Sequence, residues 1–129
     1  MELLLDTCAF IWWDSGGSDR LSAAAKAALH DPANRLHLSH ASLWEMQLKH
    51  QKGKLLLRKP LADIVQEQCT QNGLHLLPIE PPDIYGLGQL PFHHADPFDR
   101  LILSQTRRHE FSVVTDDAEF AKYGVRIVW

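Results

Sequence analysis

The stretch DPFDRLILSQTRRHEFSVVTDD, residues 96–117, decides the fold because it joins a helix to a short apolar strand. Asp96 before Pro97 is a good helix N-cap, since its carboxylate accepts backbone N–H groups while proline occupies the first helical position. Residues 96–110 are therefore predicted as a helix and residues 111–115 as a buried strand. A helix that leads directly into an apolar strand is typical of a parallel sheet.

The same alternation extends over the rest of the sequence. Apolar runs bounded by polar or turn-forming residues predict four more strands, and Ala-rich or amphipathic segments predict the helices between them. The expected order is β-α-α-β-α-α-β-α-α-β-α-β. The strands are expected at 2–6, 34–39, 74–79 and 125–129, with helices from about Thr7, over 20–31, 39–53, 60–73 and 81–90, and helical turns over 116–124.

The fold class that follows is α/β, a three-layer α/β/α sandwich with a central, mostly parallel sheet and Rossmann-like topology. Right-handed crossovers between parallel strands place helices on both faces of such a sheet. The chain has 129 residues, of which 45% are hydrophobic, so residues 1–129 are expected to form a single domain. The carboxyl ends of the strands then share one edge, where ligands usually bind.

Several classes of protein are excluded by patterns that the sequence lacks. No apolar run approaches the ~18 residues that cross a bilayer, and no basic, cleavable leader is recognisable, so a cytoplasmic protein with no membrane partner is expected. Glycine patterns of dinucleotide and P-loop sites are missing, which argues against a nucleotide cofactor. Cys8 and Cys69 form no CxxC pair and are expected as buried free thiols. The net charge of −3 argues against bulk electrostatic coating of nucleic acid.

Acidic residues recur where this topology brings strand ends together. Asp6 ends the first strand, Asp116 and Asp117 follow the fourth, and Asp99 lies in the first turn of the helix that Asp96 caps. Each has an ordinary structural explanation when taken singly, with Asp6 and Asp116 as helix caps and Asp99 as a partner of the helix dipole.

Glu45 lies on the helix after the second strand, within reach of the same edge. It could complete a capping box with Ser42, or pair with Lys49 four residues further on. Capping gains ~1 kcal/mol per residue, whereas two carboxylates ~5 Å apart repel by roughly 3 kcal/mol at an effective dielectric of 20. A convergent cluster of these acids therefore requires protons or a cation as compensation.

A cluster of oxygen ligands without Cys or His suits a hard ion, Mg²⁺ or Mn²⁺, that also accepts phosphate oxygens. Such an ion activates water and stabilises the charge that builds up during phosphodiester cleavage. The acidic edge therefore points to phosphodiester hydrolysis.

Four segments of the sequence together resemble the PIN-domain ribonucleases, in particular the VapC-type toxins of type II toxin–antitoxin pairs. The segments are LLLDT (3–7), SLWEMQLKHQKGKL (42–55), HHADPFDRLILSQ (93–105) and VVTDDAEFAKYGVRIVW (113–129), in that family's order and spacing. By this resemblance the metal-binding and catalytic positions fall on Asp6, Glu45, Asp99 and Asp117.

The resemblance also separates the adjacent acids. Asp117 is preferred over Asp116 because the family pattern is Thr-any-Asp, here starting at Thr115. Asp96 is assigned the helix cap and an outer role around the metal. Thr7, Thr115 and Asp116 are expected to hydrogen-bond a carboxylate or to position substrate.

The function that the resemblance implies is a Mg²⁺-dependent endoribonuclease, with Mn²⁺ as a substitute, acting as the toxin of a type II pair. Such proteins are usually homodimeric and are silenced by a small antitoxin that inserts near the acidic site, often with an arginine. The alternatives are a catalytically silent binding module of the same fold and a nuclease directed at DNA or at a nucleic-acid structure. A phosphoacceptor receiver domain needs a lysine after a late strand, and the sequence has none there.

The remaining candidates concern RNA contact and packing. Five of the thirteen Lys and Arg residues fall in KHQKGKLLLRK, residues 49–59, which is either a solvated surface or a phosphate-binding segment. His93 and His94 are adjacent and cannot both face one ion, so loop or surface roles are expected. Cys8 is expected to pack or to line the pocket, and the four tryptophans to serve the core and a dimer interface. The residues considered for RNA contact are Lys49, Lys52, Lys54 and Arg100.

Overall fold

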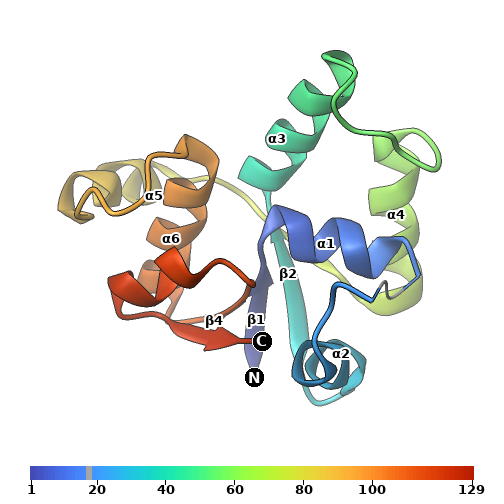
Figure 1. The fold of residues 1–129 in the computed structure, drawn as a ribbon, viewed down its shortest axis with the longest axis horizontal. Helices are drawn as coiled ribbons and strands as arrows, with labels where there is room; N and C mark the ends of the chain where they lie inside the picture. The colour runs from blue at the N-terminus through green and yellow to red at the C-terminus, as the bar shows by residue number, and fades with distance from the viewer. Residues whose placement is uncertain (17–18) are drawn as a thin grey trace.

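The computed structural model describes residues 1–16 and 19–129, and its elements follow the predicted order (Figure 1). The strands are β1 (Glu2–Leu5), β2 (Arg35–Ser39), β3 (His75–Leu77), β4 (Ser112–Val114) and β5 (Arg126–Val128). The helices are α1 (Thr7–Asp14), α2 (Ala23–His30), α3 (His40–Gln51), α4 (Leu61–Asn72), α5 (Pro81–Tyr85) and α6 (Pro97–His109), with 3-10 helices η1 (Gly86–Gln89) and η2 (Ala118–Tyr123).

The sheet has the order β3-β2-β1-β4-β5, with β1 in the middle. All four pairings between neighbouring strands are parallel. The sheet that the sequence predicts as mostly parallel is therefore parallel throughout its described strands. Every described strand ends at the same edge, as the crossover argument requires.

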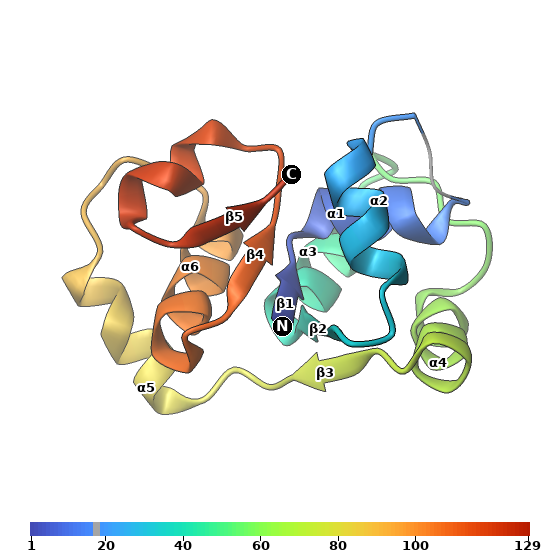
Figure 2. The same ribbon diagram turned by 90° about the horizontal axis from the view of Figure 1, so that it is seen from below.

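Helices cover both faces of the sheet, which confirms the three-layer architecture (Figure 2). Leu3 and Leu5 belong to a core shared with residues of α1, α2 and α4, including Phe10. Leu4, between them in the strand, belongs to the second core with Ile102 of α6. All three leucines of β1 are fully buried, as expected of a continuous apolar run in a strand covered on both sides.

Three segments carry the acids to the carboxyl edge. Asp6 follows β1 directly and caps α1, and Ser39 ends β2 and caps α3. Asp117 follows β4 and caps η2. Because these strands are parallel neighbours or near neighbours in the sheet, the helix starts that follow them are brought together at one edge.

Outside the cores, the expectation that both cysteines are buried needs correction. Both cysteines are free, as expected, but neither is buried: Cys8 is exposed and Cys69 is partly exposed. Trp12 packs against Trp129 with ring centroids 5.9 Å apart, whereas Trp44 is 56% exposed. Among the described helices, none has the length and apolar character needed to span a membrane.

Candidate metal centre

The carboxyl edge contains an acidic pocket of about 300 Å³. It is formed by the residue after β1, the start of α1, the middle of α3, the start of α6 and the turn after β4. All four acids assigned to the metal, together with Asp96 and Asp116, are brought together here. The lining residues are Asp6, Thr7, Cys8, Glu45, Lys49, Asp96, Asp99, Asp116 and Asp117.

Asp6 is held by two neutral donors. Its Oδ1 accepts from the Ala9 N–H at 2.8 Å, which is the expected N-cap bond, and its Oδ2 accepts from Thr115 Oγ1 at 2.6 Å. Burial raises the pKa of Asp6 to about 6, and the charges of Asp116 and Asp117 add to the rise, against the effect of the two hydrogen bonds. No cation is paired with this carboxylate in the described part of the chain.

Glu45 differs from Asp6 because one of its partners is charged. Its Oε1 accepts from Thr7 Oγ1 at 2.6 Å, and its Oε2 accepts from Lys49 Nζ at 2.6 Å. The i,i+4 pairing with Lys49 is therefore confirmed. The capping box is wrong, because α3 begins at His40, two residues before Ser42, and its cap is Ser39, whose hydroxyl accepts from the Ala41 N–H at 3.0 Å.

Asp99 and Asp117 face each other across a histidine. His94 Nε2 lies 2.8 Å from Asp117 Oδ2 and 3.1 Å from Asp99 Oδ2. Asp117 Oδ1 accepts from the Glu119 N–H at 2.9 Å, so Asp117 caps the turn after β4, a role that the sequence had suggested for Asp116. Burial raises the pKa of Asp99 to about 7, with a further contribution from the charge of Asp96, while His94 opposes the rise.

The donor set fits a small divalent ion. One ligand atom each from His94, Asp99 and Asp117 lie within 4.8 Å of one another. The raised pKa values of Asp6 and Asp99 show that the cluster favours protons over bare negative charge, and an ion would relieve the same repulsion. Carboxylate oxygens in a partly open pocket are the ligands that Mg²⁺ and Mn²⁺ prefer.

Asp96 caps α6, as the sequence predicts. Its Oδ1 accepts from the backbone N–H groups of Phe98 at 2.8 Å and Asp99 at 3.0 Å, which satisfies two donors at the start of α6. Its carboxylate also lines the pocket. The same residue therefore fixes the helix start that presents Asp99.

The expectation that Arg100 contacts RNA is wrong. Its residue surface is only 9% exposed. Its guanidinium donates to four backbone carbonyls of the segment before α6, at 2.9–3.3 Å. A buried cation needs such acceptors, and this one fastens the segment to α6. The acceptors belong to Leu87, Leu90, Pro91 and His94.

His94 is the functional candidate that the sequence argument missed. The observation that adjacent histidines cannot both face one ion holds, since His93 packs edge-on against Tyr123 with ring centroids 5.4 Å apart. One of the two histidines, His94, nevertheless faces the acids. The signal was the position of His94, two residues before the helix cap, where a loop side chain can turn back over the first helical turn.

Cys8 lines the pocket, as expected. Local desolvation and the neighbouring charges of Asp6 and Glu45 raise the pKa of its thiol to about 11. A thiol that stays protonated is a poor metal ligand, so Cys8 contributes to the pocket wall.

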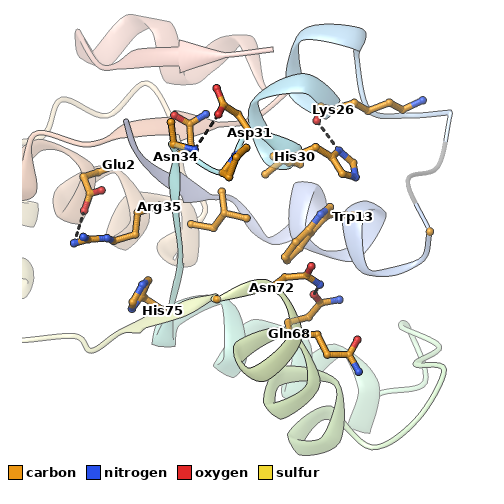
Figure 3. Close-up of a pocket in the computed structure, with 17 residues that line it drawn as sticks. Glu2, Trp13, Lys26, His30, Asp31, Asn34, Arg35, Gln68, Asn72 and His75 are labelled. Atoms are coloured by element: carbon orange, nitrogen blue, oxygen red, sulfur yellow. Dashed lines mark hydrogen bonds and ion pairs between the residues drawn. The ribbon is translucent and has the colours of Figure 1, made fainter.

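A larger pocket, of about 1010 Å³, lies at the opposite edge of the sheet (Figure 3). Its polar side chains satisfy one another: Asn72 Nδ2 donates to Gln68 Oε1 at 2.7 Å, and Arg35 pairs with Glu2. The described residues that line it form no cluster of metal-binding or nucleophilic groups. Of these two pockets, the smaller, acidic one therefore contains the candidate metal-binding carboxylates.

Comparisons with known proteins agree with this fold. The family model described as PIN domain matches residues 3–126. No curated protein matches the chain. Among solved structures, VapBC2 from Rickettsia felis bound to a promoter DNA fragment is similar with a TM-score of 0.73 and 15% identity, over 98% of this chain and 97% of that one.

Two further structures extend the likeness. DNA-bound VapBC from Salmonella typhimurium has a TM-score of 0.70 and 19% identity, over 98% of this chain and 96% of that one. FitAcB from Neisseria gonorrhoeae has a TM-score of 0.63 and 21% identity, with the same coverage. At these identities the similarity is one of fold.

Proposed function

The chain belongs to the PIN domain family, and from this premise we propose that it is a metal-dependent endoribonuclease that acts as the toxin of a type II toxin–antitoxin pair. Mg²⁺ is the proposed cofactor, with Mn²⁺ as a substitute, and the cytoplasm is the proposed location. The observation that carries the proposal is the convergence of Asp6, Glu45, Asp99 and Asp117 from four separate elements into one pocket.

The side of the pocket that lacks a lysine is the proposed place for the ion. Asp99 and Asp117 would hold it, with Asp6 beside them, because Glu45 already has Lys49 as its counter-charge. The bound ion would supply an activated water and positive charge against the phosphate oxygens. Thr115 holds Asp6 at 2.6 Å and also accepts from the Asp117 N–H at 3.0 Å, so one hydroxyl fixes two acids.

The proposal that the substrate is RNA is supported by the basic residues at the end of α3. Lys49 is 46% exposed beside the pocket, and Lys52 and Lys54 are exposed just beyond it along the chain. Cations next to an acidic site can hold the RNA backbone, which the acids alone would repel. Arg100 is not proposed to contact RNA, since it is buried and both terminal nitrogens of its guanidinium donate to backbone carbonyls.

The proposal of a protein partner is supported by the names of similar structures. A structure from Klebsiella pneumoniae is described as a toxin–antitoxin complex, and it is 19% identical with a TM-score of 0.58. A cognate antitoxin is accordingly proposed for this chain, and an arginine from it would find strong charge-assisted partners in the acidic pocket. A homodimer is also proposed, with exposed apolar side chains such as Trp44, Tyr85 and Phe92 available for burial.

Cleavage of nucleic acids by the purified protein tests the proposal. A mixed RNA panel and single- and double-stranded DNA are offered with Mg²⁺, with Mn²⁺ and with EDTA. The proposal expects RNA cleavage that needs the metal and is lost in Asp99→Asn. Cleavage of DNA alone would favour the DNA-directed alternative, and metal binding without any cleavage would favour the silent binding module.

The matched control is Asp96→Asn. Asparagine caps a helix as well as aspartate does, so this variant keeps the start of α6 while removing one carboxylate of the same pocket. Cleavage that survives EDTA, or that is equal in wild type and Asp99→Asn, would point to a contaminant and would overturn the proposal.

A further inference from the structure

His94 lies in the segment between η1 and α6, directly against two of the acids proposed to hold the ion. We propose that His94 is a positioning residue whose Nε2–H donates to both Asp99 and Asp117 and aims these carboxylates at the ion, without ligating the ion itself. This inference rests on the proposed function, because it concerns how this chain prepares its metal ligands.

The donor and acceptor roles of the ring follow from the contact on its other nitrogen. The backbone N–H of Asp96 donates to His94 Nδ1 at 3.2 Å. A ring nitrogen that accepts a hydrogen bond carries no proton, so the proton of the neutral ring is on Nε2. That nitrogen lies 2.8 Å from Asp117 Oδ2 and 3.1 Å from Asp99 Oδ2, both within donor distance.

The backbone of His94 is fixed on both sides. Its N–H donates to Tyr123 Oη at 2.7 Å, and its carbonyl accepts from Arg100 Nη1 at 3.3 Å. The ring meets Phe120 edge-on, with ring centroids 5.8 Å apart. The buried guanidinium of Arg100 thus has a purpose at the site, since it fastens the segment that carries His94.

A direct metal–imidazole bond is the competing arrangement, because the ligand atoms of His94, Asp99 and Asp117 are close enough to share an ion. Ligation through Nε2 would move the ring proton to Nδ1, where it would face the Asp96 N–H, donor against donor. Metal-bound histidines normally donate their second N–H to an acceptor, and the backbone here offers none. His94 is also not among the residues that line the acidic pocket.

The tautomer is measured directly in the metal-free protein. Long-range ¹H–¹⁵N NMR of histidine-labelled protein, recorded over a range of pH, assigns the proton of the neutral ring to one ring nitrogen. His94→Gln identifies the His94 signals by their loss. The proposal expects Nε2–H, and a ring protonated on Nδ1 would overturn it.

Mn²⁺ binding then tests the role. Mn²⁺ titrations followed by EPR compare wild type with His94→Ala, His94→Gln and His94→Asn. The affinity should fall about 10-fold in His94→Ala. It should return in His94→Gln, whose amide N–H reaches as far as Nε2, and it should not return in His94→Asn, whose amide is too short. Thermal unfolding of each variant confirms that it is folded.

The outcomes distinguish a failure of the role proposed for His94 from a failure of the proposed metal-dependent function. An imidazole nitrogen coupled to bound Mn²⁺ in electron spin-echo spectra and lost in His94→Ala, or unchanged affinity in His94→Ala, would overturn the inference alone. A wild-type protein that binds no Mn²⁺ would overturn the proposed metal-dependent function, and with it the purpose assigned to His94.

Discussion

Glu45 and Asp99 line the same pocket, but their charges are balanced in different ways. Glu45 has a hydroxyl on one oxygen and the Lys49 ammonium on the other, each at 2.6 Å. Asp99 faces Asp117 and a histidine, and burial raises its pKa to about 7. A carboxylate's partners, more than its place in the pocket, therefore decide whether it is available to bind a metal ion.

The largest expected effect comes from a substitution on the side of the pocket where no lysine balances the acids. Asp117→Asn should lower metal-dependent RNA cleavage by at least about 100-fold, because losing a ligand costs more than losing an outer partner. Asparagine still caps η2, so the fold should survive. Single-turnover cleavage rates measure the loss.

The matched control for that variant is its neighbour. Asp116→Asn should lower cleavage by less than about 10-fold, since His94 holds Asp117, and not Asp116, opposite Asp99. An equal loss of cleavage in both variants would contradict the assignment of Asp117, and not Asp116, as a metal ligand.

The next effect concerns pH and stability of the metal-free protein. Asp99 has a folded-state pKa of about 7, against 3.8 for the ordinary carboxyl. Between these values the folded protein binds more protons than the unfolded chain, so the free energy of unfolding falls as the pH rises through this window. Over this whole window Asp99 lowers the free energy of unfolding by roughly 4 kcal/mol at most.

Urea denaturation with EDTA at several values from about pH 5 to pH 8 measures this slope. Asp99→Asn should flatten it and should stabilise the metal-free protein at the alkaline end, while added Mn²⁺ should stabilise wild type there by binding the folded state. A wild-type protein whose stability rises over the same window would contradict the balance described for Asp99.

A smaller effect, on protein stability, is expected from removing the neutral hydroxyl that donates to Asp6. Thr115→Val removes the hydroxyl that donates to Asp6 Oδ2 and keeps the shape of the side chain. A buried acceptor without its donor costs about 1–2 kcal/mol, so urea denaturation should show a loss of that size at about pH 8. The loss should shrink at about pH 5, where Asp6, with its pKa raised to about 6, is mostly protonated. A pH-independent loss would show that the hydrogen bond to Asp6 contributes nothing, and would leave packing and the bond from the Asp117 N–H to the same hydroxyl as the cause.

The smallest effect comes from a substitution of Lys49, on the side of the pocket where a lysine balances Glu45. Lys49→Met removes the ammonium beside Glu45 and keeps an unbranched apolar stem. Removing one nearby positive charge should strengthen Mn²⁺ binding by roughly 3-fold, while RNA affinity should fall and should depend less on salt. Weaker Mn²⁺ binding in this variant would show that Lys49 helps the ion, contrary to the account.

Local patterns account for what the sequence predicted well. The continuous apolar run Leu3–Leu5 marks a strand buried on both faces, and Asp96 before Pro97 marks a helix start, because each depends on neighbouring residues. The i,i+4 pair of Glu45 and Lys49 is local for the same reason.

Features that depend on the path of a loop could not be predicted in this way. Arg100 follows Asp99 on an otherwise polar-looking helix start, and only the fold shows that the preceding segment wraps over it. His94 reaches the acids through the same segment. Cys8 was expected to be buried from its residue type, whereas its position at the pocket mouth leaves it exposed.

The most direct test of the account compares Mn²⁺ binding by Asp99→Asn and Glu45→Gln, each with its side-chain shape preserved, at about pH 8. Asp99→Asn should weaken Mn²⁺ binding by at least about 30-fold, and Glu45→Gln should weaken it by less than about 5-fold. A larger loss in Glu45→Gln would contradict the account, because the ion would then depend most on the carboxylate that already has a lysine.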